Sequence, residues 1–319
     1  RIAQQQAKTS EQLSDENERS VTAKQVAEVK KAYLAILLAQ EQRQLVLRSI
    51  DRAQQALREA RTLYRQQLAT DADTLRAYVE VENGRPNLSK LDRNIRLLTN
   101  QLVAVLALPA GTELALTDSL TYTPDEPAGE DVTVGRAWSQ RPELRQLALN
   151  LELSRRQTDL ERARRLPSLH LFGQVGTLSQ LNNFRFSDSR WPLVTYVGLQ
   201  LNVPLVNPTT PMKVQQARIA HWQAEEQLRY NKELIANDVR SGLYALEEAR
   251  ERIRSQAGVV RAAERSYALT QSRYRQGLTR FTDVTDAELA LRQAQTNRLQ
   301  AVYDYLIAKV DLDRATGQE

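Results

Sequence analysis

Two aspartates offer the clearest chemistry in this sequence. Asp283 and Asp286 lie three positions apart in YRQGLTRFTDVTDAE (274–288), where a polar helical pattern restarts after Gly277. In the first turn of a helix, carboxylates accept backbone N–H groups and meet the positive end of the dipole. A catalytic pair would need a partner base, a nucleophile or a cleft, and the neighbouring sequence supplies none. The third explanation is a role that arises only when several chains assemble.

Other reactive groups are scarce. The chain has no cysteine, which excludes disulfides and thiolate sites and fits an oxidising compartment. His170 and His221 are far apart in the sequence and have no ligand-like neighbours. Phosphate-loop, nucleophile-elbow and zinc-helix motifs are absent from the sequence. We therefore predict no catalytic residue, no metal and no cofactor, and a protein that is not an enzyme.

The composition is that of long helices with narrow apolar stripes. Of 319 residues, 41% are hydrophobic and 26% charged, and none of the 11 Gly or 10 Pro precedes Gly84. The net charge of +5 is a small excess of 44 basic over 39 acidic residues, which are interleaved. Interleaved charges indicate solvated helix surfaces, so we expect no nucleic acid as a partner.

The sequence is duplicated. YRQQLATDADTLRA (64–77) aligns without gaps on YRQGLTRFTDVTDA (274–287) at an offset of 210, and Val29 and Ala53 fall on Val239 and Ala263 in the same register. Further upstream, RIA at 1–3 matches RIA at 218–220 at an offset of 217, which is one additional heptad. Insertion of a heptad keeps the buried stripe of a coiled coil in phase. Two tandem repeats follow from this alignment.

Each repeat is predicted to be a long antiparallel helical hairpin. Apolar and small residues step by three and four positions along each copy, as in the seam of a coiled coil. The first hairpin (1–107) turns near 69–71, and the second (206–319) turns near Gly277. The stretch with the two aspartates is therefore the tip of the second hairpin.

The segment between the repeats has a different character. Residues 108–142 hold Pro and Gly and are predicted to be an irregular connector, and residues 143–168 a short helix. Apolar and polar residues then alternate over 169–177 and 193–203, which predicts a β-hairpin at 169–205 with one apolar face. Such strands suit a transmembrane barrel with a wet lumen. A hairpin packed on a helix bundle is the alternative.

Four motifs in this order resemble the TolC-type outer-membrane efflux factor family. They are RPEL (141–144), ARRLPSLHLFGQVG (163–176), YVGLQLNVPL (196–205) and RYRQGLTRFTDVTDAELAL (273–291), the last followed by helix to LDRATG (312–317). With the duplication they span nearly the whole chain.

The resemblance implies a mainly α fold whose helical hairpins form a periplasmic tunnel, with the β-hairpin contributing to a trimeric outer-membrane β-barrel. It implies a homotrimer in the outer membrane of a Gram-negative bacterium, extending into the periplasm and surrounded by outer-membrane lipid. The partners implied are a periplasmic adaptor protein and an inner-membrane pump. The channel itself would be a passive duct for efflux or type I secretion.

The resemblance also assigns roles at the tips. Asp283 and Asp286 match acidic residues that project into the channel entrance, where three chains would form rings of carboxylates. Tyr274 matches a residue that helps to hold the entrance closed. The family's best-known form has an arginine where this chain has Thr279, and the neighbouring Arg280 is the candidate substitute. The turn offered to the adaptor corresponds to Gly277, Leu278 and Thr279, with Asp71 and Asp73 at the first tip.

One departure from the family concerns the strands. Members carry one strand hairpin per repeat, whereas this sequence contains a single one, so we expect the other to precede residue 1 in a longer protein. A reduced family member without a full barrel is the alternative explanation. The alternative function is that of a soluble or membrane-associated coiled-coil scaffold. Such a protein has no use for the alternating segments, and these strands therefore discriminate between the two functions.

Overall fold

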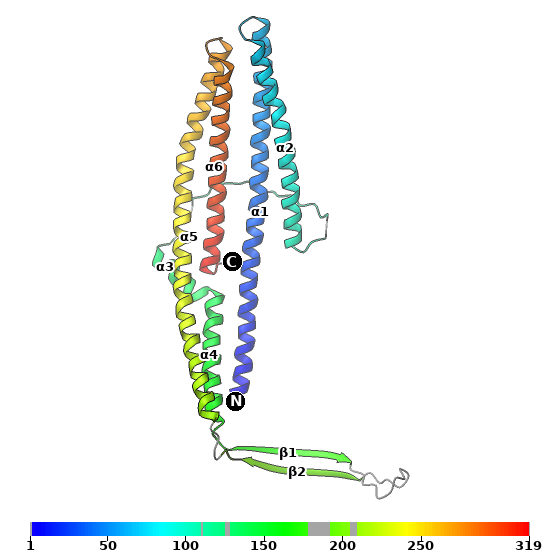
Figure 1. Cartoon of the computed structure of the whole chain (residues 1–319), viewed down its shortest axis with the longest axis vertical. Coiled ribbons are helices and arrows are strands. Elements are labelled where there is room, and N and C mark those ends of the chain that lie inside the picture. The colour runs from blue at the N-terminus through cyan, green and yellow to red at the C-terminus, as the bar shows by residue number, and fades with distance from the viewer. Residues whose placement is uncertain (1, 110, 125–127, 178–191, 205–208, 319) are drawn as a thin grey trace, which may run out of the picture. The chain divides into compact units, whose positions relative to one another are not determined.

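Figure 1 shows long helices and a β-hairpin, the kinds of element that the periodicities of the sequence predict. The computed structural model describes residues 2–109, 111–124, 128–177, 192–204 and 209–318. In chain order the elements are α1 (Ile2–Arg65), α2 (Asp71–Val105), α3 (Glu130–Gln140), α4 (Pro142–Ala163), β1 (Ser168–Thr177), β2 (Leu193–Asn202), α5 (Thr209–Arg275) and α6 (Phe281–Thr316). The predicted mainly α fold with two helical hairpins and a small β-hairpin is confirmed.

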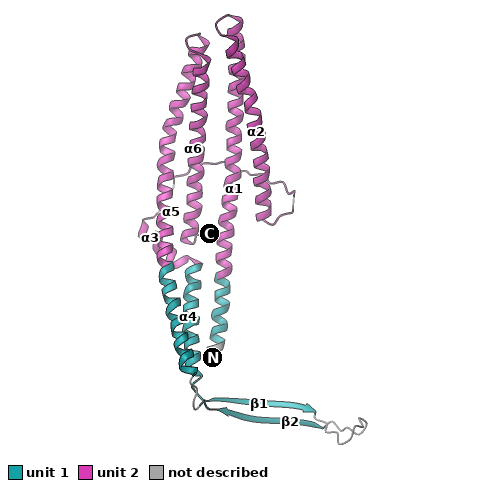
Figure 2. Ribbon diagram, in the orientation of Figure 1, with its two compact units in different colours: residues 1–16, 143–231 teal, residues 17–142, 232–319 magenta. Residues whose placement is uncertain are grey.

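The chain divides into two compact units (Figure 2). Unit 1 comprises residues 1–16 and 143–231, and unit 2 comprises residues 17–142 and 232–319. Unit 2 contains the tips of both hairpins and therefore both predicted aspartates. Unit 1 contains the β-hairpin.

The two hairpin tips of unit 2 have the same backbone. α1 ends at Arg65 and α2 begins at Asp71, while α5 ends at Arg275 and α6 begins at Phe281, so the offset of 210 holds for the structure. Gln67 has φ 60° and Gly277 has φ 71°. Leu68 N donates to Leu63 O, and Leu278 N donates to Arg273 O, both at 2.9 Å. Both helices therefore end in a Schellman turn with one left-handed residue.

Small residues allow the hairpins to pack closely. The buried cluster near the tips draws on all four long helices, and its α1 members include Ala53, Ala56 and Ala60. Larger side chains fill it from the second hairpin, namely Tyr267, Tyr274, Phe281, Val284 and Leu291. The seam is narrow, as the coiled-coil spacing predicts, because alanine brings helix axes together but buries little apolar area.

In unit 1, polar contacts join α4 to its neighbouring helices. Gln146 Nε2 donates to Glu16 O at 2.8 Å, and Ser154 Oγ lies 3.0 Å from His221 Nδ1. Ser154 Oγ also donates to Leu151 O at 2.7 Å. His221 therefore belongs to the packing of α4 on α5.

β1 and β2 pair antiparallel in a two-stranded sheet within the described residues. Leu169 pairs with Leu201 and Leu171 with Leu199, which places all four side chains on one face. His170 pairs with Gln200 on the opposite face, where the ring of Phe172 covers Gly198. Leu171 is 74% exposed and Leu199 69% exposed, so unit 1 leaves its apolar sheet face bare. The predicted strand alternation is confirmed.

None of the described helices combines the length and the apolar character that crossing a membrane requires.

One predicted segment is corrected. Residues 108–142 were expected to be irregular, yet α3 occupies Glu130–Gln140. Gly129 precedes this helix, Glu130 and Asp131 lie in its first turn, and Thr133, Val134 and Ala137 are buried. Acidic residues at a helix start and an apolar stripe with helical spacing favour helix, and here they outweigh the β-branched residues and Gly135.

Gly84 provides a test of how closely α1 and α2 pack. A Cβ at Gly84 would lie 2.5 Å from Ile50 Cγ1, whereas one at Gly135 would meet nothing within 4 Å. Gly84→Ala should lower the free energy of unfolding by roughly 1–3 kcal/mol through overpacking. Gly135→Ala should raise it by about 0.5–1 kcal/mol through helix propensity. Thermal unfolding of both variants would decide, and equal stabilities would contradict the close packing.

Candidate functional site: the hairpin tips

Asp283 lies in the first turn of α6 and caps the start of that helix. Its Oδ2 accepts a hydrogen bond from Arg280 N at 3.2 Å and another from the Thr279 hydroxyl. The Thr279 hydroxyl, the Arg280 backbone N–H and the Arg280 charge together lower the pKa of the Asp283 carboxyl. The capping explanation drawn from the sequence therefore describes Asp283 correctly, and its carboxylate is favoured in the ionised form.

Asp286 has a different environment. It lies one turn further along α6 and is exposed, and its side chain makes no hydrogen bond or ion pair with the described residues. In the first repeat its counterpart is Arg76. The second tip thus presents two exposed carboxylates: that of Asp283, which caps α6, and that of Asp286, which is free.

Tyr274, predicted to help close an entrance, is buried inside unit 2. Only 4% of its surface is exposed, and its ring meets that of Phe281 edge-to-face at 5.4 Å. Its hydroxyl has no hydrogen-bond partner among the described residues. Burial, followed by the charges of Asp73 and Glu59, raises the pKa of Tyr274 to about 12. Asp73 from the first tip and Tyr274 from the second are therefore within electrostatic range of each other.

The first tip uses its acidic residues locally. Asp73 Oδ2 accepts from Thr70 N at 3.0 Å, and Asp73 N donates to Thr70 Oγ1 at 3.3 Å, which is a capping box. The Thr74 hydroxyl donates to Asp71 Oδ1 at 3.2 Å. Both aspartates predicted to meet an adaptor are thus engaged in the start of α2.

The turn residues predicted to face an adaptor lie at the surface. Leu278 is exposed, as is its counterpart Leu68 at the first tip. Gly277 adopts the left-handed conformation of the turn, and Thr279 contacts Asp283. The structure therefore brings Gly277, Leu278, Thr279, Arg280 and Asp283 together in one exposed turn.

Sequence reasoning missed a buried ionic cluster behind the tips. Glu288 of α6 is 8% exposed and accepts from Ser49 Oγ at 2.6 Å and from Arg52 Nη2 at 3.1 Å. Arg292 lies 3.8 Å from Glu288 and 3.4 Å from Glu80 of α2. The only signal in the sequence was the mismatch within the repeat, since Glu288 falls on Tyr78.

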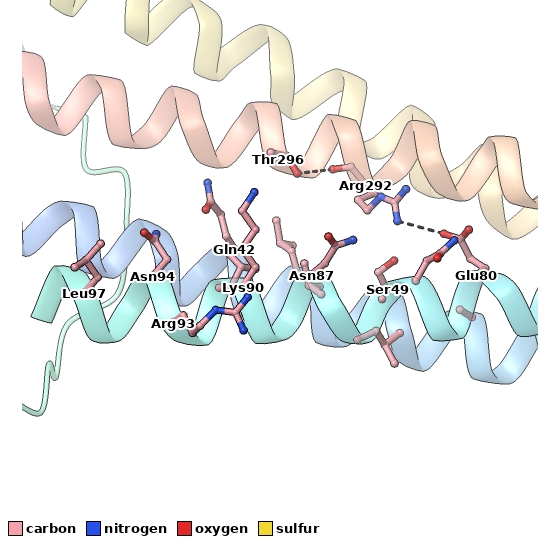
Figure 3. Close-up of a pocket in the computed structure, with 17 residues that line it drawn as sticks. Gln42, Ser49, Glu80, Asn87, Lys90, Arg93, Asn94, Leu97, Arg292 and Thr296 are labelled. Carbon is pink, nitrogen blue, oxygen red and sulfur yellow. Dashed lines mark hydrogen bonds and ion pairs between the residues drawn. The ribbon is translucent and has the colours of Figure 1, made fainter.

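Beside this cluster, α1, α2 and α6 line a cleft of about 860 Å³ (Figure 3). Its lining includes Gln42, Asn87 and Lys90, with Arg292 and Glu80 at one end. None of the residues predicted to act at the tips lines it.

The fold is that of known outer-membrane channels. The solved structure of the outer-membrane channel OprN matches with a TM-score of 0.82 at 18% identity, covering 100% of this chain and 72% of that one. The open state of the Neisseria gonorrhoeae MtrE outer membrane channel matches with a TM-score of 0.79 at 20% identity, covering 98% and 71%. At these identities the likeness establishes the fold alone.

The sequence establishes the family. Residues 133–318 match the family described as outer membrane efflux protein, and the chain belongs to that family. The resemblance to the TolC type is confirmed, and with it the assignment to the outer membrane.

Curated relatives agree with this assignment. The alkaline protease secretion protein AprF of Pseudomonas aeruginosa is 27% identical over 310 residues, which cover 93% of this chain. The outer membrane protein TolC of Salmonella enteritidis is 25% identical over 291 residues, which cover 85% of it. The chain spans 62% and 58% of the lengths of these two relatives.

The buried hydroxyl of Tyr274 leads to a test by Tyr274→Phe. Because an unpaired buried hydroxyl is unfavourable, this variant should be more stable, with a free energy of unfolding raised by about 1 kcal/mol. The unfolded chain loses the phenolic proton near pH 10.0 and the folded chain near 12, so stability should fall as the pH rises between these values.

Tyr274→Phe should remove the part of the alkaline loss of stability that comes from the Tyr274 hydroxyl. Denaturant unfolding of the variant at a pH below 10.0 and at a pH between 10.0 and 12 would measure it. Tyr230→Phe is the control, because the Tyr230 ring is exposed. If the two variants lose stability alike on the alkaline side, Tyr274 is not buried as described.

Proposed function

We propose that the chain is the protomer of a homotrimeric outer-membrane channel that serves as a passive exit duct for efflux or type I secretion. Membership of the outer membrane efflux protein family supports this proposal. The observation that carries it is the exposed pair Asp283 and Asp286 at the tip of a long helical hairpin. A periplasmic adaptor at the tips and an inner-membrane pump that supplies the energy belong to the same proposal.

The β-hairpin is proposed as the membrane segment. Its face with Leu169, Leu171, Leu199 and Leu201 is exposed in unit 1, and a bare apolar sheet face is unfavourable in water. Lipid on that face and water on the face of His170 and Gln200 match the pattern of barrel strands. Strands from other copies would complete the sheet, because a lone two-stranded hairpin has little stability of its own.

Asp283 and Asp286 are proposed to narrow the entrance. Three-fold symmetry would bring two carboxylates from each chain around one axis, and carboxylate rings attract cations and repel anions. The hydrogen bonds that lower the pKa of Asp283 keep it charged in such a ring. Like charges held close together resist constriction unless a cation bridges them.

The remaining tip residues are assigned within this proposal. Arg280 is the N-cap residue that precedes α6 and has an exposed side chain, so it is available to pair with a neighbouring copy in place of the arginine absent at position 279. Tyr274 acts from inside the protomer, where its packing on Phe281 fixes the turn. The exposed turn with Gly277, Leu278 and Thr279 is the surface offered to the adaptor, alongside the first tip with Asp71 and Asp73.

The membrane role of the sheet face can be tested with paired lysines. Leu171→Lys with Leu199→Lys should abolish association with liposomes in a flotation assay, because a lysine on a lipid face costs about 2–4 kcal/mol near the bilayer midplane. His170→Lys with Gln200→Lys adds the same charge at the adjacent register pair on the other face and should leave flotation unchanged. Equal flotation of both double variants would argue against a membrane face.

The entrance role can be tested by single-channel recording. Asp286→Asn removes a carboxylate that has no capping role, so its effect reports on the channel rather than on the helix. In Asp286→Asn, blocking the channel should require roughly tenfold more Mg²⁺. A contact to a charged group contributes about 1.5–3 kcal/mol, and a loss of about 1.4 kcal/mol weakens binding tenfold. Adding Asp283→Asn should weaken the block further.

The control is Asp51→Asn, which removes an exposed carboxylate from α1 away from the tip. If Asp286→Asn and Asp51→Asn conduct and block alike, the aspartates do not line the entrance.

A further inference from the structure

The net positive charge of the chain is concentrated around the β-hairpin. Between Arg162 and Ala224 the sequence has seven Lys or Arg and one Asp, an excess of six, whereas the whole chain has a net charge of +5. Acidic and basic residues are therefore balanced elsewhere. An asymmetry of this kind indicates a surface that meets an anionic partner.

The seam between α4 and α5 shows which residues of these two helices lie at the same level (Figure 2). Ser154 Oγ of α4 lies 3.0 Å from His221 Nδ1 of α5. Further along α4 and further back along α5, the buried residues of the seam are Thr158, Glu161, Ala217 and Val214. This order is antiparallel and in constant register, so the last turn of α4 lies beside the first turns of α5.

Three cations at this level have no counter-charge within the chain. Arg165 follows α4, and Lys213 and Arg218 lie in the first three turns of α5. All three are exposed, and their side chains make no hydrogen bond or ion pair with the described residues. We call Arg165, Lys213 and Arg218 the basic collar.

The few acidic residues at this level are already engaged. Among the described residues 2–10, 159–177, 192–204 and 209–224, the only acidic ones are Asp159 and Glu161. Asp159 pairs with Arg162 at 3.1 Å, and Glu161 pairs with Arg164 at 3.4 Å. Neither carboxylate is left to neutralise the basic collar.

The neighbouring helix α1 adds positive charge instead of a counter-charge. Gln6 Nε2 donates to Gln157 Oε1 at 3.4 Å, which places the start of α1 beside the last two turns of α4. Residues 2–10 of α1 include the exposed Lys8 and no acidic residue. A further copy of the chain, related by rotation about the membrane normal, would bring the same cations to the same level. The counter-charge must therefore come from a different molecule.

Helix dipoles account for only part of the basic collar. A cation after the C-terminal end of α4 is favourable to the dipole of that helix, which suffices to explain Arg165. Lys213 lies near the N-terminal end of α5, where the dipole favours acidic residues, and the first turn of α5 has none. An external anion explains both positions.

The basic collar lies at the end of the β-hairpin that leads into the helices. Ser168 pairs with Asn202 at that end, three residues after Arg165. A strand of ten residues reaches about 33 Å, close to the ~30 Å of a hydrocarbon core, so a hairpin that crosses the bilayer sets the collar at the headgroups of one leaflet. Leu166 is 65% exposed and Met212 is 75% exposed, and each adjoins a cation of the collar. Such pairs of apolar and cationic side chains suit the membrane interface.

We propose that the basic collar binds the phosphate groups of anionic phospholipids in the leaflet on the helix side of the β-hairpin, which is the periplasmic leaflet. A phospholipid supplies phosphate oxygens for the cations and acyl chains for Leu166 and Met212, whereas a free phosphate would satisfy the cations alone. The bound headgroups fix the depth of the hairpin in the bilayer. This inference rests on the membrane role proposed above for the β-hairpin, and it names the lipid class that this end of the hairpin takes.

Flotation with vesicles of two compositions tests the basic collar. The full chain is titrated with phosphatidylcholine vesicles and with vesicles of equimolar phosphatidylcholine and phosphatidylglycerol, and the lipid concentration at half-maximal flotation is measured. Each cation near an anionic surface strengthens binding roughly fivefold. The triple variant Arg165→Gln, Lys213→Gln and Arg218→Gln should therefore require on the order of a hundredfold more of the equimolar lipid, and it should bind phosphatidylcholine vesicles as the unaltered chain does.

The matched control removes the same three charges from α5 in unit 2. Arg254, Arg261 and Arg265 are exposed, and Arg254→Gln with Arg261→Gln and Arg265→Gln should keep the preference for the equimolar vesicles. In a second control, soluble glycerol phosphate is added at constant ionic strength and should leave flotation of the unaltered chain unchanged.

The outcomes separate this inference from the proposal on which it rests. If both triple variants bind the equimolar vesicles alike, the basic collar is overturned while the membrane role of the β-hairpin stands. If the unaltered chain floats with neither kind of vesicle, both are overturned. If glycerol phosphate removes the preference for the equimolar vesicles, the collar binds free phosphate and the assignment to lipid is wrong. A loss confined to the collar variant and to the anionic vesicles establishes the lipid site.

Discussion

Unit 2 depends on a carboxylate that is buried between its two hairpins. Glu288 accepts hydrogen bonds from Ser49 and Arg52 on α1, and Arg292 links it to Glu80 on α2. A buried ion pair contributes little net stability, but removing one partner costs about 3–5 kcal/mol because the remaining charge is left unpaired. The cluster therefore acts mainly on specificity. It fixes the axial position of α6 relative to α1, which a seam of alanines leaves poorly determined.

The geometry of the tips follows from this axial position. Phe281, Val284 and Glu288 occupy one side of α6, at spacings of three and four, so the helix that buries Glu288 also buries Phe281 and Tyr274. Asp283 and Asp286 then necessarily lie on the exposed sides of the same helix. A slip of α6 along α1 would bury an aspartate without a donor. The acidic tip and the ionic cluster are thus two results of one helix register.

The sequence was sufficient for the features that depend on periodicity. Steps of three and four gave the four long helices, alternation gave β1 and β2, and the offset of 210 gave identical tips. It was insufficient where a local pattern has two physical outcomes. α3 lies in a stretch rich in β-branched residues, where acidic residues in the first turn and a buried apolar stripe with helical spacing favour helix. Glu288 is one of 39 acidic residues in the sequence, and its burial depends on its contact with Ser49, which is distant in the sequence.

The two tips have matching backbones but differ in the residues at equivalent positions of the repeat. Gln67 adopts the left-handed conformation that Gly277 adopts without penalty, so the first tip accepts strain of about 1 kcal/mol to keep the same turn. Its acidic residue Asp73 is used in a capping box with Thr70, and Arg76 stands where the second tip has Asp286. Free negative charge is therefore concentrated on the second tip. A ring built from such chains would alternate between tips that differ in charge but not in shape, and its electrostatic character would come from α6.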